Sequence, residues 1–462
     1  MMEWQAALEG MNGSGEYHRR WKKMKFMPAS DSAIYRSYET RMTIFRMFSD
    51  KVGSKREALP QFSLGAASVY TSFASDLTQL LNEHIKTNLN FTKDDVMTFE
   101  DAHLLEVVNA AFARFNNAEL LQHVLWLFID VYGPIADPTL LIPPGNGQES
   151  NKTWLRYCSF QVESSYYLLV NALFVISHLT PVERQFISEL TGTIHLKAVQ
   201  LIRDANWLEW RSKSMAIAKL EGLQTVLWPR HEFLTEDSLS DIYRSFPDNA
   251  SSFSDYWLRT RQALRNYTAQ NPQLTSELLG APGGYDQIIS YVHVLNTEFV
   301  SMAALASPLF YESGTQAMLY GGLGYQYARQ LVRALDSTGV TVDAYGSIVP
   351  QWLSGSSAAD YWKRVKCLGA VDEDIFPDLP ALELAYLAYI SATQMQGPKL
   401  FPSKTEEQVF FMTACLGMCK HQRGRSEKSC NKALVAFRPF AEAFQCDSSS
   451  EMRFPEKCPF FR

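Results

Sequence analysis

The sequence predicts a mainly α-helical protein with two or more packed lobes and one small β element near residues 288–300. Apolar residues recur at three- and four-residue spacing through most of residues 33–223, as in helices that pack against a core. The chain has 462 residues, more than a single hydrophobic core usually organises. Only residues 288–295 (IISYVHVL) combine the β-branched and aromatic residues that strands favour.

The helical spacing is clearest in four segments, at residues 33–48, 99–115, 118–132 and 182–202. Proline, glycine and asparagine make residues 133–153 a long predicted loop. A helix is expected to start at a cap formed by Thr235 or Asp237, and residues 278–287 form the clearest break in composition. Farther on, residues 321–336 are predicted to form a loop followed by a helix, and residues 381–395 another helix.

Composition argues against nucleic acid and membrane as partners. The formal net charge is −6 and no strongly basic stretch is present, which disfavours nucleic-acid binding. The first residues lack the continuous apolar core of a signal peptide. The most apolar runs, Val124–Ile129 and the residues around Asn171, are too short or too interrupted to span a bilayer. We therefore expect no membrane segment in this chain.

Two other features favour an extracellular protein. Five Asn-x-Ser/Thr triplets begin at Asn12, Asn90, Asn151, Asn249 and Asn266, and the last four of these are expected glycosylation sites. Four of the seven cysteines fall within the last 44 residues, a density typical of an extracellular terminus held by disulfides.

Potential metal ligands are sparse. The nine histidines contain no pair at the spacing that places two ligands on one helix face. Cys415, Cys419, His421 and Cys430 form the only cluster of soft ligands. The extracellular features favour disulfides over zinc for these cysteines.

The segment YGGLGYQYARQLVRALD (Tyr320–Asp336) places Arg329, Gln330 and Arg333 on one predicted helix. Two arginines at i and i+4 ordinarily belong to a solvated helix face. By themselves, these two arginines do not indicate a catalytic or binding site.

Five segments in order resemble neprilysin and the endothelin-converting-enzyme-like zinc endopeptidases, a gluzincin family. They are residues 204–229 (DANWLEW…VLWP), 307–352 (SPLFYESGTQAMLYGGLG…VPQW), 374–389 (DIFPDLPALELAYLAY), 410–419 (FFMTACLGMC) and 437–461 (FRPFAEAFQC…PEKCPFF). The resemblance extends from about residue 33 to the end. It implies a large two-lobed, mostly helical fold: a poorly defined segment 1–32, part of the family's helical N-terminal lobe at 33–280, and a catalytic-type lobe at 281–462.

The resemblance also implies that the family's cytoplasmic tail and membrane anchor precede the part matched here. We therefore expect an N-terminally shortened member, through genuine loss or an incomplete gene model. Family members act outside the cell or at its surface, so the same location is expected for this protein.

The family's active-site positions fall on altered residues. The resemblance places the two zinc-binding histidines at Arg329 and Arg333, the general-base glutamate at Gln330, and the third ligand at Asp374. The aspartate that orients the first histidine falls on Asp378.

The family's substrate-binding positions have diverged as well. The strand that anchors substrate falls on Ile289–Val292, without its asparagine and alanine. The histidine that stabilises the transition state falls near Arg423, with His421 as a shifted remnant, and the arginine that binds the substrate carboxylate falls near Ser429.

These substitutions remove the expected chemistry. Arginine has no free lone pair and stays protonated, so Arg329 and Arg333 repel Zn²⁺ instead of binding it. Gln330 cannot accept a proton from a metal-bound water. No zinc is therefore expected, and we hypothesise that Arg329 and Arg333 instead form ion pairs with Asp374 and Asp378. Pro377 and Pro380 argue against a regular helix through this segment.

The resemblance implies one disulfide, Cys367–Cys458. Cys158, Cys419 and Cys446 match family cysteines whose partners lie in the missing N-terminal region, whereas Cys415 and Cys430 have no counterpart. The pairing of these five cysteines stays open.

The leading functional hypothesis is a catalytically inactive neprilysin-like protein that binds peptides or extracellular proteins, or that has no retained function. The alternative is an active zinc metalloendopeptidase that cleaves small peptides with non-standard metal ligands. A third reading is a truncated product that folds poorly, because lost helices expose core surface.

Overall fold

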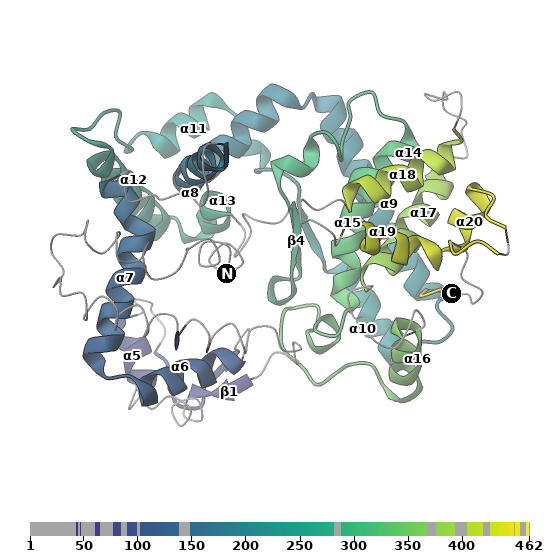
Figure 1. The fold of residues 1–462 in the computed structure, drawn as a ribbon, viewed down its shortest axis with the longest axis horizontal. Helices are drawn as coiled ribbons and strands as arrows, with labels where there is room; N and C mark the ends of the chain where they lie inside the picture. Colours follow the sequence, from purple (N-terminus) through teal and green to yellow (C-terminus); the bar gives the residue numbers. More distant parts are fainter. Residues whose placement is uncertain are drawn as a thin grey trace. The chain divides into compact units, whose positions relative to one another are not determined.

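The computed structural model describes residues 43–44, 47, 61–64, 77–84, 90–98, 102–137, 148–280, 288–366, 376–392, 404–418, 426–447, 449–452 and 459–461. These residues are mainly helical with short strands, which confirms the predicted fold class (Figure 1). The chain divides into two compact units. Unit 1 comprises Met1–Tyr166 and Ile242–Leu274, and unit 2 comprises Tyr167–Asp241 and Thr275–Arg462. The predicted lobe boundary at residues 280 and 281 stays a prediction.

Unit 1 is built from helices and one short antiparallel sheet. Its elements are β1 (Gln61–Ser63), α5 (Leu77–His84), β2 (Val96–Thr98), α6 (Ala102–Arg114), α7 (Asn117–Ala136), the first part of α8 (Gln148–His178), and α12 (Phe253–Gln270). Asn116 starts α7 with a capping box, in which its side chain accepts from Glu119 N and the Glu119 side chain accepts from Asn116 N. The predicted helices at 99–115 and 118–132 are confirmed as α6 and α7.

The predicted loop at residues 133–153 is wrong at both ends. Helix α7 continues through Pro134 to Ala136, and α8 already begins at Gln148. A proline in the last turn removes only one backbone hydrogen bond, so the helix tolerates it. Helix α8 is interrupted at Tyr166, whose backbone is non-helical (φ −129°, ψ 34°), at the residue where this segment of unit 1 ends.

The helices of unit 2 are α9 (Pro181–Asp204), α10 (Trp210–Glu221), α13 (Thr275–Leu279), α14 (Gln316–Leu319), α15 (Tyr325–Leu331), α16 (Gly355–Val365), α17 (Asp378–Ala392), α18 (Glu406–Gly417), α19 (Ser426–Val435) and α20 (Arg438–Ala443). The predicted helices at 182–202 and 381–395 are confirmed as α9 and α17 over their described residues. Helix α11 (Glu236–Tyr243) follows Thr235, whose Oγ1 accepts from Ser238 N at 3.4 Å, so Thr235 is the cap.

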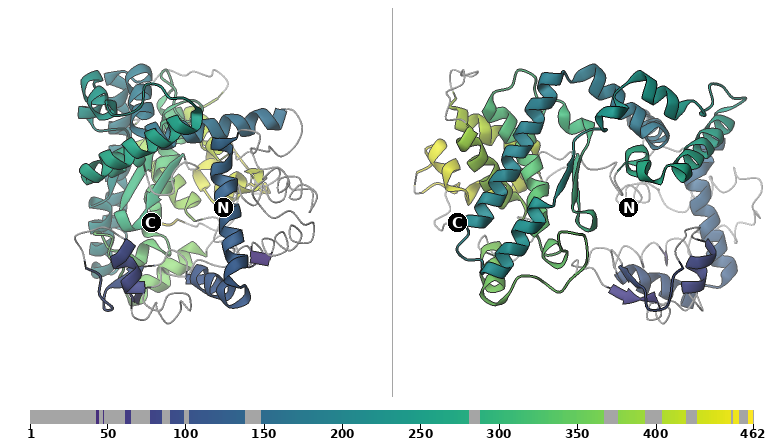
Figure 2. Two further views of the ribbon diagram at one scale, coloured as in Figure 1. Left: turned by 90° about the vertical axis from the view of Figure 1, so that its left-hand side faces the viewer. Right: turned by 180° about the vertical axis from the view of Figure 1, so that it is seen from behind.

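The predicted β element is part of a three-stranded sheet in unit 2. Strand β5 (Thr297–Val300) lies between β3 (Gln224–Val226), to which it is parallel, and β4 (Ile289–Val292), to which it is antiparallel. The predicted strand 288–295 is too long, because His293–Leu295 forms a 3₁₀ turn and Asn296 adopts a left-handed conformation (φ 47°) that reverses the chain. Strand β3 was not anticipated. Figure 2 shows the strands from two further sides, and the sheet packs against α15.

The glycines of Tyr320–Gly324 lie inside a helix, and not in the predicted loop. This segment is a π-helical turn that joins α14 to α15. A Cβ on Gly321 would lie 2.3 Å from Phe410 O, and one on Gly322 would lie 2.4 Å from Leu309 O. Because they lack a Cβ, the glycines allow the backbones of α18 and of Leu309 to pack directly against this turn.

Within the described residues, no single helix is long and apolar enough to cross a membrane, and one pair, Trp154–His178 with Pro181–Asp204, meets that test only across a 109° bend.

Candidate functional site

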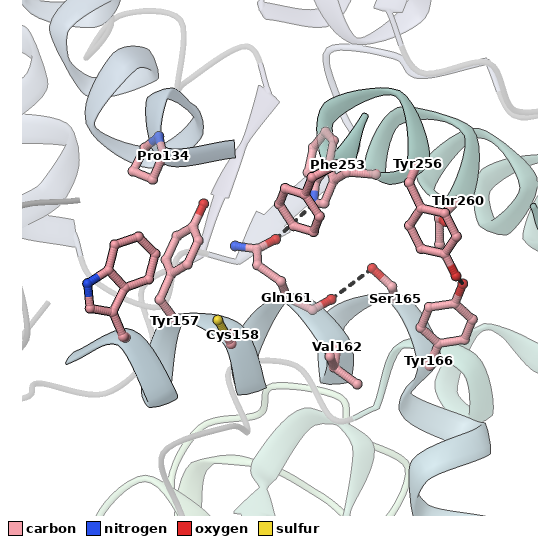
Figure 3. A pocket seen from close by; sticks show the side chains of 12 residues that line it. Pro134, Tyr157, Cys158, Gln161, Val162, Ser165, Tyr166, Phe253, Tyr256 and Thr260 are labelled. Carbon is pink, nitrogen blue, oxygen red and sulfur yellow. Dashed lines mark hydrogen bonds between the residues drawn. The ribbon is translucent and has the colours of Figure 1, made fainter. Parts of the chain in front are cut away.

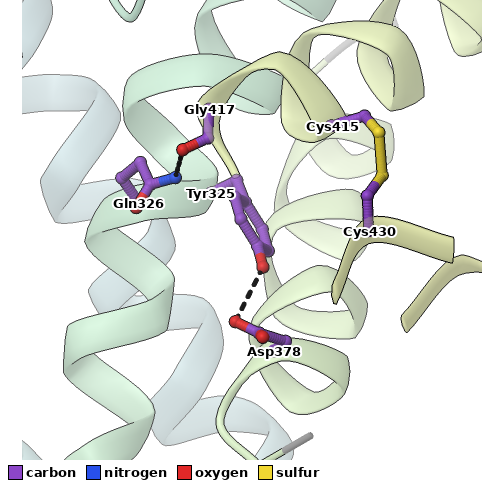
Figure 4. The surroundings of a disulfide bond; sticks show 6 residues. All are labelled: Tyr325, Gln326, Asp378, Cys415, Gly417 and Cys430. Carbon is purple, nitrogen blue, oxygen red and sulfur yellow. Dashed lines mark hydrogen bonds between the residues drawn. A yellow bond between two sulfur atoms is a disulfide. The ribbon is translucent and has the colours of Figure 1, made fainter. Parts of the chain in front are cut away.

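The candidate site lies where α15 meets the start of α17, two elements in extensive contact. Helix α15 is held by its neighbours: Gln326 Nε2 donates to Gly417 O at 2.8 Å, which fixes it to the end of α18 (Figure 4). Helix α17 begins at Asp378, directly after Pro377. No helix is described directly before Pro377, in keeping with the prediction, whereas Pro380 is tolerated in the first turn of α17, where its missing N–H has no intrahelical partner to lose.

Arg329 and Asp378 form an ion pair across this contact, through Arg329 Nε and Asp378 Oδ1. Tyr325 Oη, one turn earlier on α15, donates to the same oxygen at 3.1 Å (Figure 4). The Asp378 side chain is only 6% exposed and that of Arg329 is 28% exposed. Burial opposes the charged guanidinium, but the Asp378 carboxylate and Tyr325 outweigh it and raise the pKa of Arg329. The predicted pairing of Arg329 with Asp378 is confirmed.

Among the described residues, Arg333 pairs with Asp336 and not with Asp378. Its Nε lies 3.5 Å from Oδ2 of Asp336, three residues farther along the chain. Asp336 Oδ1 also lies 3.1 Å from His293 Nε2 and accepts from Gly339 N at 2.7 Å. Burial would raise the pKa of Asp336, but His293, the Gly339 N–H and Arg333 together lower it. The other predicted carboxylate, Asp374, lies outside the described residues.

Two buried polar side chains near α15 make no hydrogen bond within the described part of the chain. Gln330 is 5% exposed and its Oε1 has no partner. Glu298, on the central strand β5, is fully buried and neither carboxyl oxygen has a partner. Burial raises the pKa of Glu298 well above its ordinary value, so its neutral form is favoured. Glu298 was missed from the sequence, where a lone acid between Thr297 and Phe299 is indistinguishable from a solvent-facing strand residue.

The residues at this site do not fit a zinc ion. Zinc requires nitrogen, sulfur or oxygen lone pairs from about three protein ligands, and guanidinium groups offer none. The Asp378 oxygen nearest to α15 is already bonded to Arg329 and Tyr325. Across the described residues, no group of three or more His, Cys, Asp or Glu side chains is arranged to hold a metal ion.

The other predicted site residues are only partly described. Ile289–Val292 forms β4, an edge strand whose single neighbour among the described strands is β5. Ser429 lies in α19. His421 and Arg423 lie outside the described residues, as do Cys367, Cys419 and Cys458.

A disulfide joins Cys415 of α18 to Cys430 of α19 (Figure 4). It resolves part of the pairing that the sequence left open, and it favours disulfide use over zinc for these two cysteines. Cys158, on α8, is an exposed thiol.

Comparisons with known proteins agree with this fold. No family model matches the sequence. The endothelin-converting enzyme-like 1 of Mus musculus is 21% identical over 349 residues, which cover 68% of this chain and 44% of that protein. Neprilysin-1 of Trittame loki is 22% identical over 355 residues, covering 68% of this chain and 49% of that protein. The chain thus spans about half the length of the curated relatives it matches.

Among solved structures, the zinc metalloprotease Zmp1 of Mycobacterium tuberculosis, in complex with an inhibitor, superposes with a TM-score of 0.69 at 16% identity, over 99% of this chain and 75% of that chain. At such low identity, the structural likeness shows the fold alone. The helical fold is therefore that of a class of zinc metallopeptidases. Together with the sequence relatives, at low identity, it supports a relationship of this chain to the neprilysin-like peptidases.

Proposed function

We propose that this chain is a catalytically inactive member of the family, in which an arginine–aspartate pair replaces the metal centre. The observation that carries the proposal is the ion pair between Arg329 and Asp378. Arg329 occupies the position of the first histidine in the family motif, and Asp378 that of the aspartate which orients this histidine. The positive charge that a metal would supply is present as a guanidinium, which cannot bind a water or polarise a carbonyl as a Lewis acid.

The general-base position supports the same proposal. Gln330 is a neutral amide that does not take up a proton at physiological pH. Its burial leaves little room for an exogenous base to take its place. Loss of the metal ligands and of the base together removes both routes to an activated water.

The rival function is a peptidase that recruits metal through other residues. It requires ligands outside the described part of the chain, such as Asp374 or His421, because the described residues contain no such group. The experiment is to incubate the purified protein with a mixed peptide library and to identify products by mass spectrometry, with and without a zinc chelator. We expect no chelator-sensitive product, and chelator-sensitive cleavage would support the rival.

We further propose that the protein binds peptides in an extended conformation along β4. This strand is at the edge of the described sheet, and it packs against α15 beside the candidate site. Backbone groups on an open strand edge pair readily with an incoming strand. Immobilised protein should capture members of the library intact, and N-methylation of the captured peptides should abolish binding because it removes the donors of a β ladder. Retention of N-methylated peptides would contradict binding by strand addition.

The described surface also supports an extracellular or cell-surface location. Asn90, Asn249 and Asn266 are exposed, and Asn249 lies in a loop after α11. The Cys415–Cys430 disulfide is of a kind that persists in oxidising compartments. Secretion from a eukaryotic host followed by glycosidase treatment should lower the mass of the protein at these sites. Complete absence of glycan on the secreted protein would contradict the proposal.

A further inference from the structure

Unit 1 contains an aromatic cavity that the proposed function does not use. It lies between the first part of α8 and α12 and has a volume of about 290 Å³. Six aromatic side chains form most of its wall: Trp154, Tyr157, Tyr166, Phe253, Tyr256 and Trp257 (Figure 3). Among the described residues, no acidic, basic or histidine side chain lines it. An uncharged, aromatic wall favours a neutral, flat ligand, because a buried charge would lack a partner there.

The walls of the cavity are held in place without a ligand. Tyr166 Oη and Tyr256 Oη share a hydrogen bond of 2.6 Å, which joins α8 to α12. The Arg261 guanidinium lies over the Trp257 ring, 5.2 Å from its centroid. A preformed site loses little conformational entropy when it binds a ligand.

Two polar groups of α8 are left for a ligand. Gln161 is 8% exposed, and its Oε1 accepts from Trp257 Nε1 at 2.8 Å. This bond orients the amide so that its nitrogen is directed to the side where Tyr157 lies (Figure 3). Tyr157 Oη is buried and has no hydrogen-bond partner within the described residues. A buried donor without a partner is costly, so an acceptor that reaches Tyr157 Oη, and that Gln161 Nε2 can also donate to, would be stabilised.

We propose that this cavity binds a small neutral molecule with an aromatic body and one carbonyl-type acceptor, held by Gln161 Nε2 and Tyr157 Oη. The volume is at the lower end for ligand sites, which limits the ligand to about two fused rings. The exposed Cys158 thiol lies on the same wall and offers a reporter for occupancy. Burial raises the pKa of Tyr157 to about 12, so its hydroxyl stays a donor at neutral pH.

The test uses the full chain and the neutral fluorescent ketone 6-propionyl-2-(dimethylamino)naphthalene. We expect saturable binding with a blue-shifted emission. Tyr157→Phe removes one hydrogen bond and should weaken binding about threefold to tenfold. Tyr267→Phe, a matched substitution on α12 outside the cavity wall, should leave binding unchanged. Cys158→Trp should fill the cavity and abolish binding, with circular dichroism confirming that each variant is folded.

Two competitors of equal size test the chemistry. Neutral 2-acetylnaphthalene should displace the probe and slow the alkylation of Cys158 by N-ethylmaleimide, measured by mass spectrometry of the labelled peptide. The anion 2-naphthoate should do neither. Non-saturable binding, equal competition by the anion, or unchanged affinity in Tyr157→Phe and Cys158→Trp would each overturn the proposal. None of these results depends on whether the site around Arg329 is active.

Discussion

Arg329 on α15 and Asp378 at the start of α17 form an ion pair that also accepts a hydrogen bond from Tyr325. The pair joins two of the most closely packed helices of unit 2, and the carboxylate is almost fully buried. A buried charge is tolerated only with a partner, so each residue depends on the other. The pair is therefore part of the packing that holds α15 against α17.

Arg329→Ala should therefore lower the free energy of unfolding by about 2–3 kcal/mol, because it leaves the Asp378 carboxylate buried without its cation. This loss of stability is smaller than that expected for a fully buried pair because solvent partly screens the exposed Arg329 side chain. Urea denaturation measures the change. The double variant Arg329→Met with Asp378→Asn should recover most of the lost stability. Its side-chain amide is uncharged, and the amide oxygen can still accept a hydrogen bond from Tyr325.

An exposed pair provides the control for this prediction. Arg259 and Asp255 form an i,i+4 pair on α12, with Arg259 60% exposed. Arg259→Ala should change the free energy of unfolding by less than about 0.5 kcal/mol. Equal effects of the Arg329 and Arg259 substitutions would show that the pair at the candidate site is not structural.

Alanine substitutions at two helical glycines should have opposite signs. Gly321→Ala places a Cβ 2.3 Å from Phe410 O and should destabilise the protein by about 1–3 kcal/mol. Gly192→Ala, in α9, places a Cβ that meets no atom of the described residues within 4 Å, and it should stabilise the protein by about 0.5–1 kcal/mol through helix propensity. Thermal melting of both variants measures the signs. A stabilising Gly321→Ala would contradict the close packing of α18 on this turn.

The glycine segment illustrates what the sequence could and could not predict. Periodicity identified α6, α7, α9 and α17, because each carries its apolar spacing within itself. Gly321 and Gly322 were predicted to lie in a loop because glycine usually interrupts a helix. They are needed here because the backbones of Phe410 and Leu309, which are not their neighbours in sequence, pack closely against them. Contacts that form only on folding leave no local signature.

The candidate site shows the same division. The pairing of Arg329 with Asp378 was predictable, because the motif frame assigned both positions to one site. The pairing of Arg333 with Asp336 was not predicted, because the motif frame directed attention to the distant carboxylates and not to a local i,i+3 pair. Nor could the sequence show that Glu298 is buried, since strand β5 became central only through the unexpected strand β3.

Glu298 leads to a prediction about pH. Its pKa in the folded protein is raised by burial, so the folded state holds a proton that the unfolded chain releases above its ordinary pKa. This group therefore makes the protein less stable as the pH rises from about 4 to 7. Glu298→Met lacks the titrating group and should be more stable than the wild type at pH 7, by about 1–3 kcal/mol.

Urea denaturation of both proteins between about pH 4 and pH 7.5 tests this prediction. The stability difference between Glu298→Met and the wild type should shrink as the pH falls below the ordinary glutamate pKa. A difference that is independent of pH, or a variant less stable than the wild type at pH 7, would show that Glu298 has a partner in solution.

The Cys415–Cys430 disulfide should contribute to stability. The two cysteines are 15 residues apart, and closing a loop of that length stabilises a protein by about 3 kcal/mol in the chain-entropy treatment. Cys430→Ser should lose this contribution, whereas Cys158→Ser, at an exposed position, should be nearly neutral. Proteolysis without reductant should yield the linked peptide pair, and finding Cys430 joined to another cysteine would contradict the assignment.

The zinc content of the purified protein is the most direct test of the central claim. The protein is dialysed first against a chelator, then against micromolar zinc, and the metal is counted by mass spectrometry against protein concentration. Because the sequence resemblance predicts Arg329 and Arg333 at the ligand positions and a guanidinium offers no lone pair, we predict far less than one zinc ion per chain. One tightly bound zinc ion per chain would contradict the account and favour the rival function, an active metallopeptidase.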